Sequence, residues 1–299
     1  MAALKTFKHT WDEDGWCVVP AVLPAEDLRA ARAAADEIFP TAEEMDSGVE
    51  DDRTSPWRAT WDAKWPEFPY ADKALNRLTF HPDVLDLAES FLGSSDLRLY
   101  MSLVTAKYAG QPSGYNQLLH TDFPNHTLLV PQDPERFPQL ELFIYLTDVS
   151  AANGATRLVS RRRTADIPVE RHTLSFTEYA ELYDDPGIAS GPAGSIMAYR
   201  PDVYHRSVDV TTPGARRIMM HVSYRLGAAE WGQYQAWGFK GFSPEWHNFV
   251  QASGPRELAL VGFPPPGHLY WDESSISRVN ARYPLLDMSP WRDALTRSA

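Results

Sequence analysis

Cysteine is almost absent from this sequence, which has Cys17 alone among its 299 residues. One thiol cannot form an internal disulfide, and it cannot supply the thiolate clusters of structural zinc or iron–sulfur sites. We therefore expect no metal site built from a cluster of thiolates.

Positive charge is also scarce, because 28 Lys and Arg residues stand against 40 Asp and Glu residues and give a net charge of −12. Nucleic-acid-binding proteins usually have a basic overall balance or a basic patch. The one basic run, Arg161 to Arg163, is typical of a solvated loop. We therefore expect a small-molecule partner and no nucleic acid.

Long hydrophobic runs are missing as well. No apolar stretch approaches the roughly 18 residues of a membrane-spanning helix. The N-terminal segment lacks the cationic start and the apolar stretch of a signal peptide, which predicts a cytoplasmic protein without membrane association. Hydrophobic residues still make up 43% of the chain, enough for a sizeable core, and we expect one domain over residues 1–299.

Two helices are predicted in a helical N-terminal support over about residues 1–95. The first opens at Pro24, after a short strand within 15–23, because apolar residues then recur at helical spacing. The second fits 81–93 and stops at a glycine. Between them, residues 43–72 are acidic and rich in proline and tryptophan, and they are interpreted as a loop or an aromatic lid.

Short β-rich runs separated by Gly, Pro, Asn and Asp dominate residues 96–225. They lie at 97–108, 140–149, 155–160, 195–200, 203–210 and 216–225. Many short strands without alternating helices indicate a mainly β protein with flanking helices, an antiparallel sandwich or barrel. Residues 161–192 are predicted to be a long excursion over one mouth of it. The aromatic and Pro-rich segment 226–299 is predicted to be an extended arm packed outside.

The stretch "LLHTDFPNH" contains a candidate metal site. His120 and Asp122 are two residues apart, so on a strand both would project from one face. A third ligand is His126, which follows a Pro-Asn turn signal, or His205, which lies in another strand-like run and is the better candidate. Two histidines and one carboxylate leave three positions of an octahedral ion open, which is typical of non-haem Fe(II) oxygenases rather than zinc sites. The alternative is that His205 is an ordinary core or surface histidine.

A nearby arginine supplies a candidate anion-binding group. The turn sequence "TTPG" separates the strand-like runs 203–210 and 216–225, which predicts a hairpin. With a four-residue loop, cross-strand pairing places Arg216 on the same sheet face as His205 and Ser207.

The neighbouring Arg217 would then point away from the metal. An arginine on the metal side of an apolar pocket needs an anion, because a buried unpaired guanidinium is very costly. A bound dicarboxylate would supply that anion. The alternative is an ion pair between Arg216 and Asp209, which would lie directly opposite.

Four motifs together resemble the phytanoyl-CoA dioxygenase family of Fe(II)- and 2-oxoglutarate-dependent oxygenases. They are "EDGWCVVPAVL", "HTD", "LTDVSAANGATRLVS" and "GSIMAYRPDVYHRS", and the resemblance spans roughly residues 7–225. It implies a double-stranded β-helix, a jelly-roll, cupin-like barrel. The chain departs from the family pattern at "RLVSRRRTAD", where many relatives have a segment ending in Pro-Gly-Ser-His.

The resemblance also implies roles for single residues. His120, Asp122 and His205 would bind iron, Arg216 would bind the distal carboxylate of 2-oxoglutarate, and Ser207 would be a second cosubstrate contact. Halogenating relatives replace the carboxylate at position 122 with Gly or Ala, and this chain keeps it. Hydroxylation, or desaturation or cyclisation, is therefore the expected reaction.

The expected function is oxidation of a small organic molecule with Fe(II), 2-oxoglutarate and O2, releasing succinate and CO2. Two alternatives stay open: a cupin-like metalloenzyme without a keto acid, and a non-catalytic small-molecule-binding barrel. Aromatic residues within 57–70 and 231–246 would suit a bulky apolar or ring-containing metabolite, although core packing explains such residues equally well.

Overall fold

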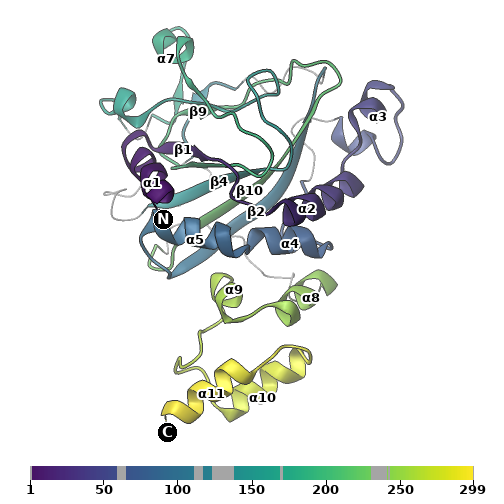
Figure 1. Cartoon of the computed structure of the whole chain (residues 1–299), viewed down its shortest axis with the longest axis vertical. Coiled ribbons are helices and arrows are strands. Elements are labelled where there is room, and N and C mark those ends of the chain that lie inside the picture. Colours follow the sequence, from purple (N-terminus) through teal and green to yellow (C-terminus); the bar gives the residue numbers. More distant parts are fainter. Residues whose placement is uncertain are drawn as a thin grey trace.

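Two five-stranded antiparallel sheets form the centre of the protein, with helices on one side of them (Figure 1). The computed structural model describes residues 2–58, 65–110, 117–122, 138–168, 171–229, 241 and 243–298.

The larger sheet has the strand order β1-β8-β4-β10-β2, and all its neighbouring strands are antiparallel. Its members are β1 (Trp16–Val19), β8 (Ile196–Tyr199), β4 (Gln139–Tyr145), β10 (Arg216–Leu226) and β2 (Leu97–Tyr108). The long strands β2 and β10 coincide with two of the predicted runs, because each run is rich in apolar, β-branched and aromatic residues over its whole length.

The smaller sheet has the order β6-β3-β9-β5-β7, and each of its strands has two residues. They are β6 (Thr173–Leu174), β3 (Leu119–His120), β9 (His205–Arg206), β5 (Arg157–Leu158) and β7 (Gly187–Ile188). Two of them, β6 and β7, come from the predicted excursion 161–192, which therefore completes this sheet. The predicted antiparallel β structure with flanking helices is confirmed, but within the described residues no ladder closes the two sheets into one barrel.

Most of the helices lie on one side of the larger sheet (Figure 1). The N-terminal ones are α1 (Ala2–Asp14), α2 (Ala25–Ile38), α3 (Ala42–Asp46), η1 (Ser55–Trp57), α4 (Lys73–Thr79) and α5 (Pro82–Leu92). The excursion adds η2 (Arg161–Thr164) and α7 (Ala180–Asp184). The two predicted helices correspond to α2 and α5, and Gly93 ends α5 with a φ of 67°. Figure 1 shows α2, α4 and α5 beneath the larger sheet and β9 above it.

Side chains of β10 alternate between two buried layers, as a pleated strand requires. Ile218 and Met220 join the main hydrophobic core between the larger sheet and the helices. Met219 packs in a second cluster between the two sheets, and Arg217 and His221 line a cavity on that same side. Odd-numbered β10 residues therefore face the space between the sheets.

The C-terminal segment is helical rather than an extended arm. Its elements are α8 (Pro244–Ala252), α9 (Pro255–Leu260), α10 (Glu273–Arg282) and α11 (Ser289–Ser298). Phe249 packs its ring 4.7 Å from Phe68 and 4.9 Å from Phe80, so α8 shares the main core with α4. Figure 1 places these four helices beyond α4 and α5, on the side away from the sheets.

Within the described ranges, none of the helices combines the length and the hydrophobicity that crossing a bilayer would require.

Candidate metal and cosubstrate site

His120 and His205 form a directly opposed pair in the smaller sheet. Their imidazole ring centroids are 4.5 Å apart. Each Nδ1 lies within hydrogen-bonding distance of the carbonyl oxygen two residues earlier, 2.9 Å from Leu118 and 3.0 Å from Val203. Because a carbonyl oxygen only accepts, each Nδ1 is the donor in its contact, and in a neutral ring Nε2 then offers its lone pair to a metal.

Asp122 completes the group of metal-binding side chains. Its backbone N–H donates to the Pro201 carbonyl at 2.8 Å. One carboxylate oxygen lies 3.8 Å from His120 Nε2, and the other lies 3.4 Å from His205 Nε2. The three potential ligand atoms all lie within 4.8 Å of one another. Two imidazole nitrogens and one carboxylate oxygen in this arrangement fit a divalent metal that takes three protein ligands.

Tyr199 contacts this group from the larger sheet. Its buried hydroxyl donates to Asp122 Oδ2 at 2.7 Å, and its ring stacks on Phe143 at 5.9 Å. Burial, reinforced by the negative charges of Asp122 and Glu141, holds the pKa of Tyr199 well above its usual value. The phenol therefore keeps its proton and acts as the donor.

A cavity of about 280 Å³ lies between the two sheets beside the metal-binding group. Asp122 and His205 line it, and so do Lys107, Ser207 and Arg217. Its size is near the lower end of the range for small-molecule sites, roughly 300–1,000 Å³. One cavity therefore joins the candidate metal ligands to a group of basic side chains.

Lys107 and Arg217 form the basic end of the cavity as cross-strand neighbours on β2 and β10. Lys107 donates a hydrogen bond to the hydroxyl of Ser207, and both basic residues are more than nine-tenths buried. Burial, with the positive charge of Arg217 as a smaller cause, lowers the pKa of Lys107 to about 6. A bound carboxylate would stabilise both positive charges.

Gly154, from the "NGAT" motif, supports this end of the cavity. Its carbonyl accepts a hydrogen bond from the Arg217 guanidinium. Its φ is 75°, and a Cβ there would lie 3.1 Å from the Val208 carbonyl oxygen. A glycine is needed because a side chain would strain the backbone that positions Arg217.

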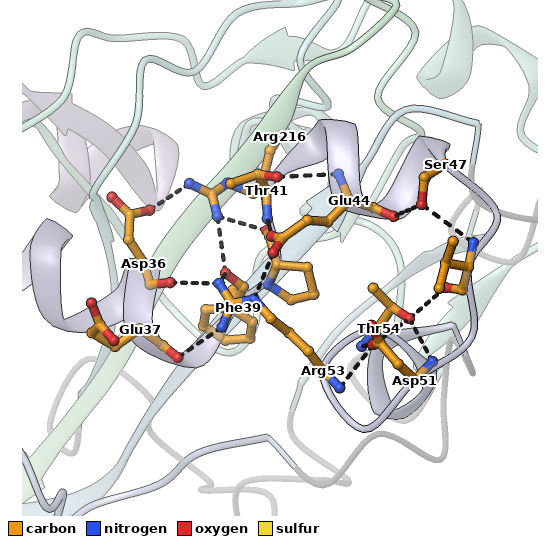
Figure 2. Close-up of polar contacts among 12 residues, drawn as sticks. Asp36, Glu37, Phe39, Thr41, Glu44, Ser47, Asp51, Arg53, Thr54 and Arg216 are labelled. Atoms are coloured by element: carbon orange, nitrogen blue, oxygen red, sulfur yellow. Dashed lines mark hydrogen bonds and ion pairs between the residues drawn. The ribbon is translucent and has the colours of Figure 1, made fainter.

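The prediction that Arg216 projects toward the metal is wrong. Its guanidinium forms an ion pair with Asp36 and donates to the carbonyls of Phe39 and Pro40, on the helix side of the larger sheet (Figure 2). Arg217, which was predicted to point away, is the arginine that lines the cavity.

The hairpin on which that prediction rested does not form. β9 pairs with β3 and β5 in the smaller sheet, whereas β10 pairs with β2 and β4 in the larger one. The "TTPG" turn thus connects two different sheets, and within the described residues His205 has no partner residue on β10. Which arginine faces the metal-binding group is decided instead by the alternation of side chains along β10.

The remaining predicted residues have mixed outcomes. Ser207 lines the cavity, and its N–H donates to Gln117 Oε1 at 3.2 Å. His126 and residues 231–240 lie outside the described residues. Of the aromatic residues within 57–70, Trp65 lines the cavity, whereas Trp57 packs on the ring of Phe39 at 4.6 Å.

A second polar group on the inward face was missed from sequence. Glu141 is fully buried and accepts from Gln139 at 2.7 Å and from His221 Nε2 at 3.0 Å, as well as from Ser223. Burying a carboxylate is costly unless several donors satisfy it. The available signal was a lone Glu or His inside an otherwise apolar strand, as in "LELFIYL" and "IMMHVSY".

A two-sheet β protein with two histidines and one carboxylate beside a basic cavity defines a class, the non-haem Fe(II) oxygenases. The family profile described as "Phytanoyl-CoA dioxygenase (PhyH)" matches residues 11–218, well over half of the chain. The chain therefore belongs to the phytanoyl-CoA dioxygenase family and is an Fe(II)- and 2-oxoglutarate-dependent enzyme of the oxygenase type. No match was found among curated proteins.

Several solved structures share this fold. SnoK, a non-haem α-ketoglutarate-dependent carbocyclase from nogalamycin biosynthesis, is 21% identical with a TM-score of 0.58, covering 81% of this chain and 91% of SnoK. The epimerase SnoN, in complex with Fe3+, α-ketoglutarate and nogalamycin RO, is 20% identical with a TM-score of 0.53, covering 80% and 88%. HygX from Streptomyces hygroscopicus, with nickel and 2-oxoglutarate bound, is 15% identical with a TM-score of 0.52, covering 74% and 86%.

Proposed function

We propose that this enzyme hydroxylates a small organic molecule, with His120, Asp122 and His205 as its iron ligands. The observation that carries the proposal is the convergence of these three side chains beside a cavity that also holds Lys107 and Arg217. A metal site alone fits many chemistries. The two buried basic groups add a site for a dianionic cosubstrate such as 2-oxoglutarate.

In this proposal, Arg217 takes the role that the sequence assigned to Arg216. Its guanidinium binds the distal carboxylate of 2-oxoglutarate, because arginine matches carboxylate geometry with two parallel donors. Lys107 adds a second positive charge from the next strand, and the Ser207 hydroxyl, which already contacts Lys107, supplies a further polar contact.

The reaction balances as substrate C–H, O2 and 2-oxoglutarate giving substrate C–OH, succinate and CO2. Bound iron supplies the redox chemistry that couples oxidation of the keto acid to oxidation of the substrate. The protein binds and orients both organic molecules and excludes water. Desaturation and cyclisation use the same components. SnoK is a carbocyclase and SnoN is an epimerase, and by analogy the outcome in this chain depends on the substrate.

The two alternatives explain less of the site. A cupin-like metalloenzyme without a keto acid has no need for Lys107 and Arg217 as buried neighbours. A non-catalytic binding protein has no need for Nδ1 of His120 and of His205 to be held by backbone carbonyls, which directs both Nε2 lone pairs to one point.

The substrate side of the cavity is assigned to the end of β10 away from Arg217. His221 lies four residues along β10, about 13 Å away at strand spacing, and it also lines the cavity. Glu141 fixes the His221 ring, and Phe143 packs on it at 4.4 Å. This end suits a ring-containing molecule that also carries a hydroxyl or amine to bond with His221.

Succinate formation tests the proposed function. The purified chain is supplied with Fe(II), ascorbate and 2-oxoglutarate and screened against a metabolite library of ring-containing alcohols and amines. Succinate should rise only with Fe(II) and a suitable metabolite, and the Asp122→Ala variant should produce none. Failure of the wild-type chain to bind one equivalent of iron would contradict the proposal, whatever the screen returns.

The His221→Phe variant tests the substrate assignment. It should keep iron and 2-oxoglutarate binding and raise the KM for any metabolite found by the screen. An unchanged KM would remove His221 from the substrate site without affecting the metal assignment.

A further inference from the structure

Tyr199, on the larger sheet, donates a hydrogen bond to the candidate metal ligand Asp122. It ends β8 and is paired across the sheet with Trp16 on one side and Glu141 on the other. Its ring lies 4.8 Å from the His205 ring, and its hydroxyl is 2.7 Å from Asp122 Oδ2. The phenol therefore spans the space between the two sheets and ends at the metal-binding carboxylate.

A nearby tyrosine provides the structural comparison. Tyr145 is also almost fully buried and belongs to the same cluster between the sheets. Its hydroxyl donates to the backbone carbonyl of Ala189 at 2.6 Å, which is an ordinary way to satisfy a buried phenol. Tyr199 instead donates its hydroxyl hydrogen bond to a carboxylate. Phe143, on the neighbouring strand, also lines the cavity, so a ring without a hydroxyl can form part of the cavity wall.

We propose that Tyr199 is a positioning residue that holds Asp122 in a one-oxygen binding mode and so keeps a metal coordination position open. This inference rests on the proposed function, because it requires the metal to bind at Asp122. A carboxylate can bind a metal through one oxygen or both. The hydrogen bond from Tyr199 uses a lone pair of Oδ2. In the two-oxygen mode, Oδ2 would need a lone pair to bind the metal.

The number of open positions decides what the site can bind. Two histidines and a one-oxygen carboxylate occupy three of six positions and leave three. A metal held in this way would have open positions for the cosubstrate and for dioxygen. If Asp122 bound through both oxygens, it would take one of these positions, and fewer would remain for the cosubstrate and dioxygen.

The matched variants Tyr199→Phe and Tyr145→Phe separate positioning from packing. Each removes one buried hydroxyl and its hydrogen bond, so each should lower the Tm by a similar amount, about 2–4 °C. Co(II), a redox-stable substitute for Fe(II), is then titrated into each full-length variant. Tyr199→Phe should weaken Co(II) binding by about tenfold to a hundredfold, and Tyr145→Phe should leave it at the wild-type value.

The visible absorption spectrum of the Co(II) protein supplies a second measurement, because its intensity reports the coordination number. With saturating 2-oxoglutarate, the spectrum of Tyr199→Phe should differ from that of the wild type, and that of Tyr145→Phe should not. Wild-type affinity and spectrum in Tyr199→Phe would overturn the inference, and so would equal losses in both variants. If the wild-type chain itself binds no Co(II), the proposed function fails first.

Discussion

The two sheets supply different parts of the site, and they differ in how they are built. The smaller sheet carries His120 and His205 on strands of two residues, whereas the larger sheet carries Lys107 and Arg217 on strands of twelve and eleven residues. Short strands have few hydrogen bonds of their own. The candidate metal-binding group therefore depends on contacts from the larger sheet, such as that of Tyr199, while the proposed cosubstrate end is fixed by the long β2–β10 ladder.

Removal of a metal ligand from the smaller-sheet side should have the largest effect. His120→Ala, Asp122→Ala and His205→Ala should each abolish turnover and stoichiometric iron binding, because each removes one of three ligands. Far-UV circular dichroism should be unchanged, since the larger sheet and its helices are not touched. His268→Ala, at an exposed site, is the control and should keep its iron. Iron retained in any of the three ligand variants would show that the residue is not a ligand.

Removal of the arginine that lines the cavity should leave iron bound and weaken the binding of the cosubstrate. An arginine–carboxylate contact contributes about 1.5–3 kcal/mol, so Arg217→Ala should raise the Kd for 2-oxoglutarate by roughly ten- to more than a hundredfold. Calorimetric titration of the iron-loaded protein measures this.

Arg216→Ala is the matched control on the opposite sheet face. It should lower the free energy of unfolding by about 1–3 kcal/mol, because Asp36 and the carbonyls of Phe39 and Pro40 each lose one of their donors. Its affinity for 2-oxoglutarate should stay at the wild-type value. A larger effect on 2-oxoglutarate at Arg216 than at Arg217 would reverse the assignment of faces.

The pH dependence of stability should report the buried Lys107. Its pKa is lowered to about 6 in the folded chain, against about 10.4 in an unfolded one. Between these values the unfolded chain binds a proton that the folded chain does not, so this group makes stability rise with pH. Its destabilising effect is greatest at and below about pH 6.

The Lys107→Met variant removes that effect. Without cosubstrate, the Tm of the variant should exceed that of the wild type at pH 6, and the difference should shrink toward pH 10. Thermal melts at the two values measure it. A difference that is the same at both pH values would mean that Lys107 stays protonated in the fold.

The smallest effect is expected at Ser207. Ser207→Ala removes one hydroxyl that accepts from Lys107, and such a bond contributes about 0.5–1.5 kcal/mol. The Kd for 2-oxoglutarate should rise by about two- to tenfold. Ser195→Ala is the control, because the fully buried Ser195 hydroxyl makes no hydrogen bond within the described residues. Equal affinities in the two variants would remove Ser207 from the cosubstrate site.

The long elements could be predicted because their signals are local. The run at 97–108 is strand β2 itself, and α5 lies within the predicted range 81–93 and is capped by the predicted glycine. Strands of two residues, such as β3 and β9, give no periodicity to detect. The first helix, α1, was missed because "TFKHTWDED" is polar and follows no clear start signal.

The sequence was sufficient to predict which types of residue form the candidate site, but not how all of them are arranged. The candidate metal-binding residues were identified from their chemistry, their spacing and the family resemblance, and the structure brings them together. The choice between Arg216 and Arg217 failed because a turn sequence specifies a local bend and not the sheet that the next strand joins. Tyr199 and Glu141 carry no motif, and their roles appear only when both sheets are in place.

One rung of the smaller sheet, with His120 opposite His205, joins segments 85 residues apart in the sequence. A metal held by both histidines would act as a non-covalent cross-link across that loop and reduce the number of conformations open to it. Amide protons of β3 and β9 would then exchange slowly only while the metal is bound. Those of β2 and β10 would stay protected in either case, so metal loading could be followed as a difference in exchange rate between the two sheets.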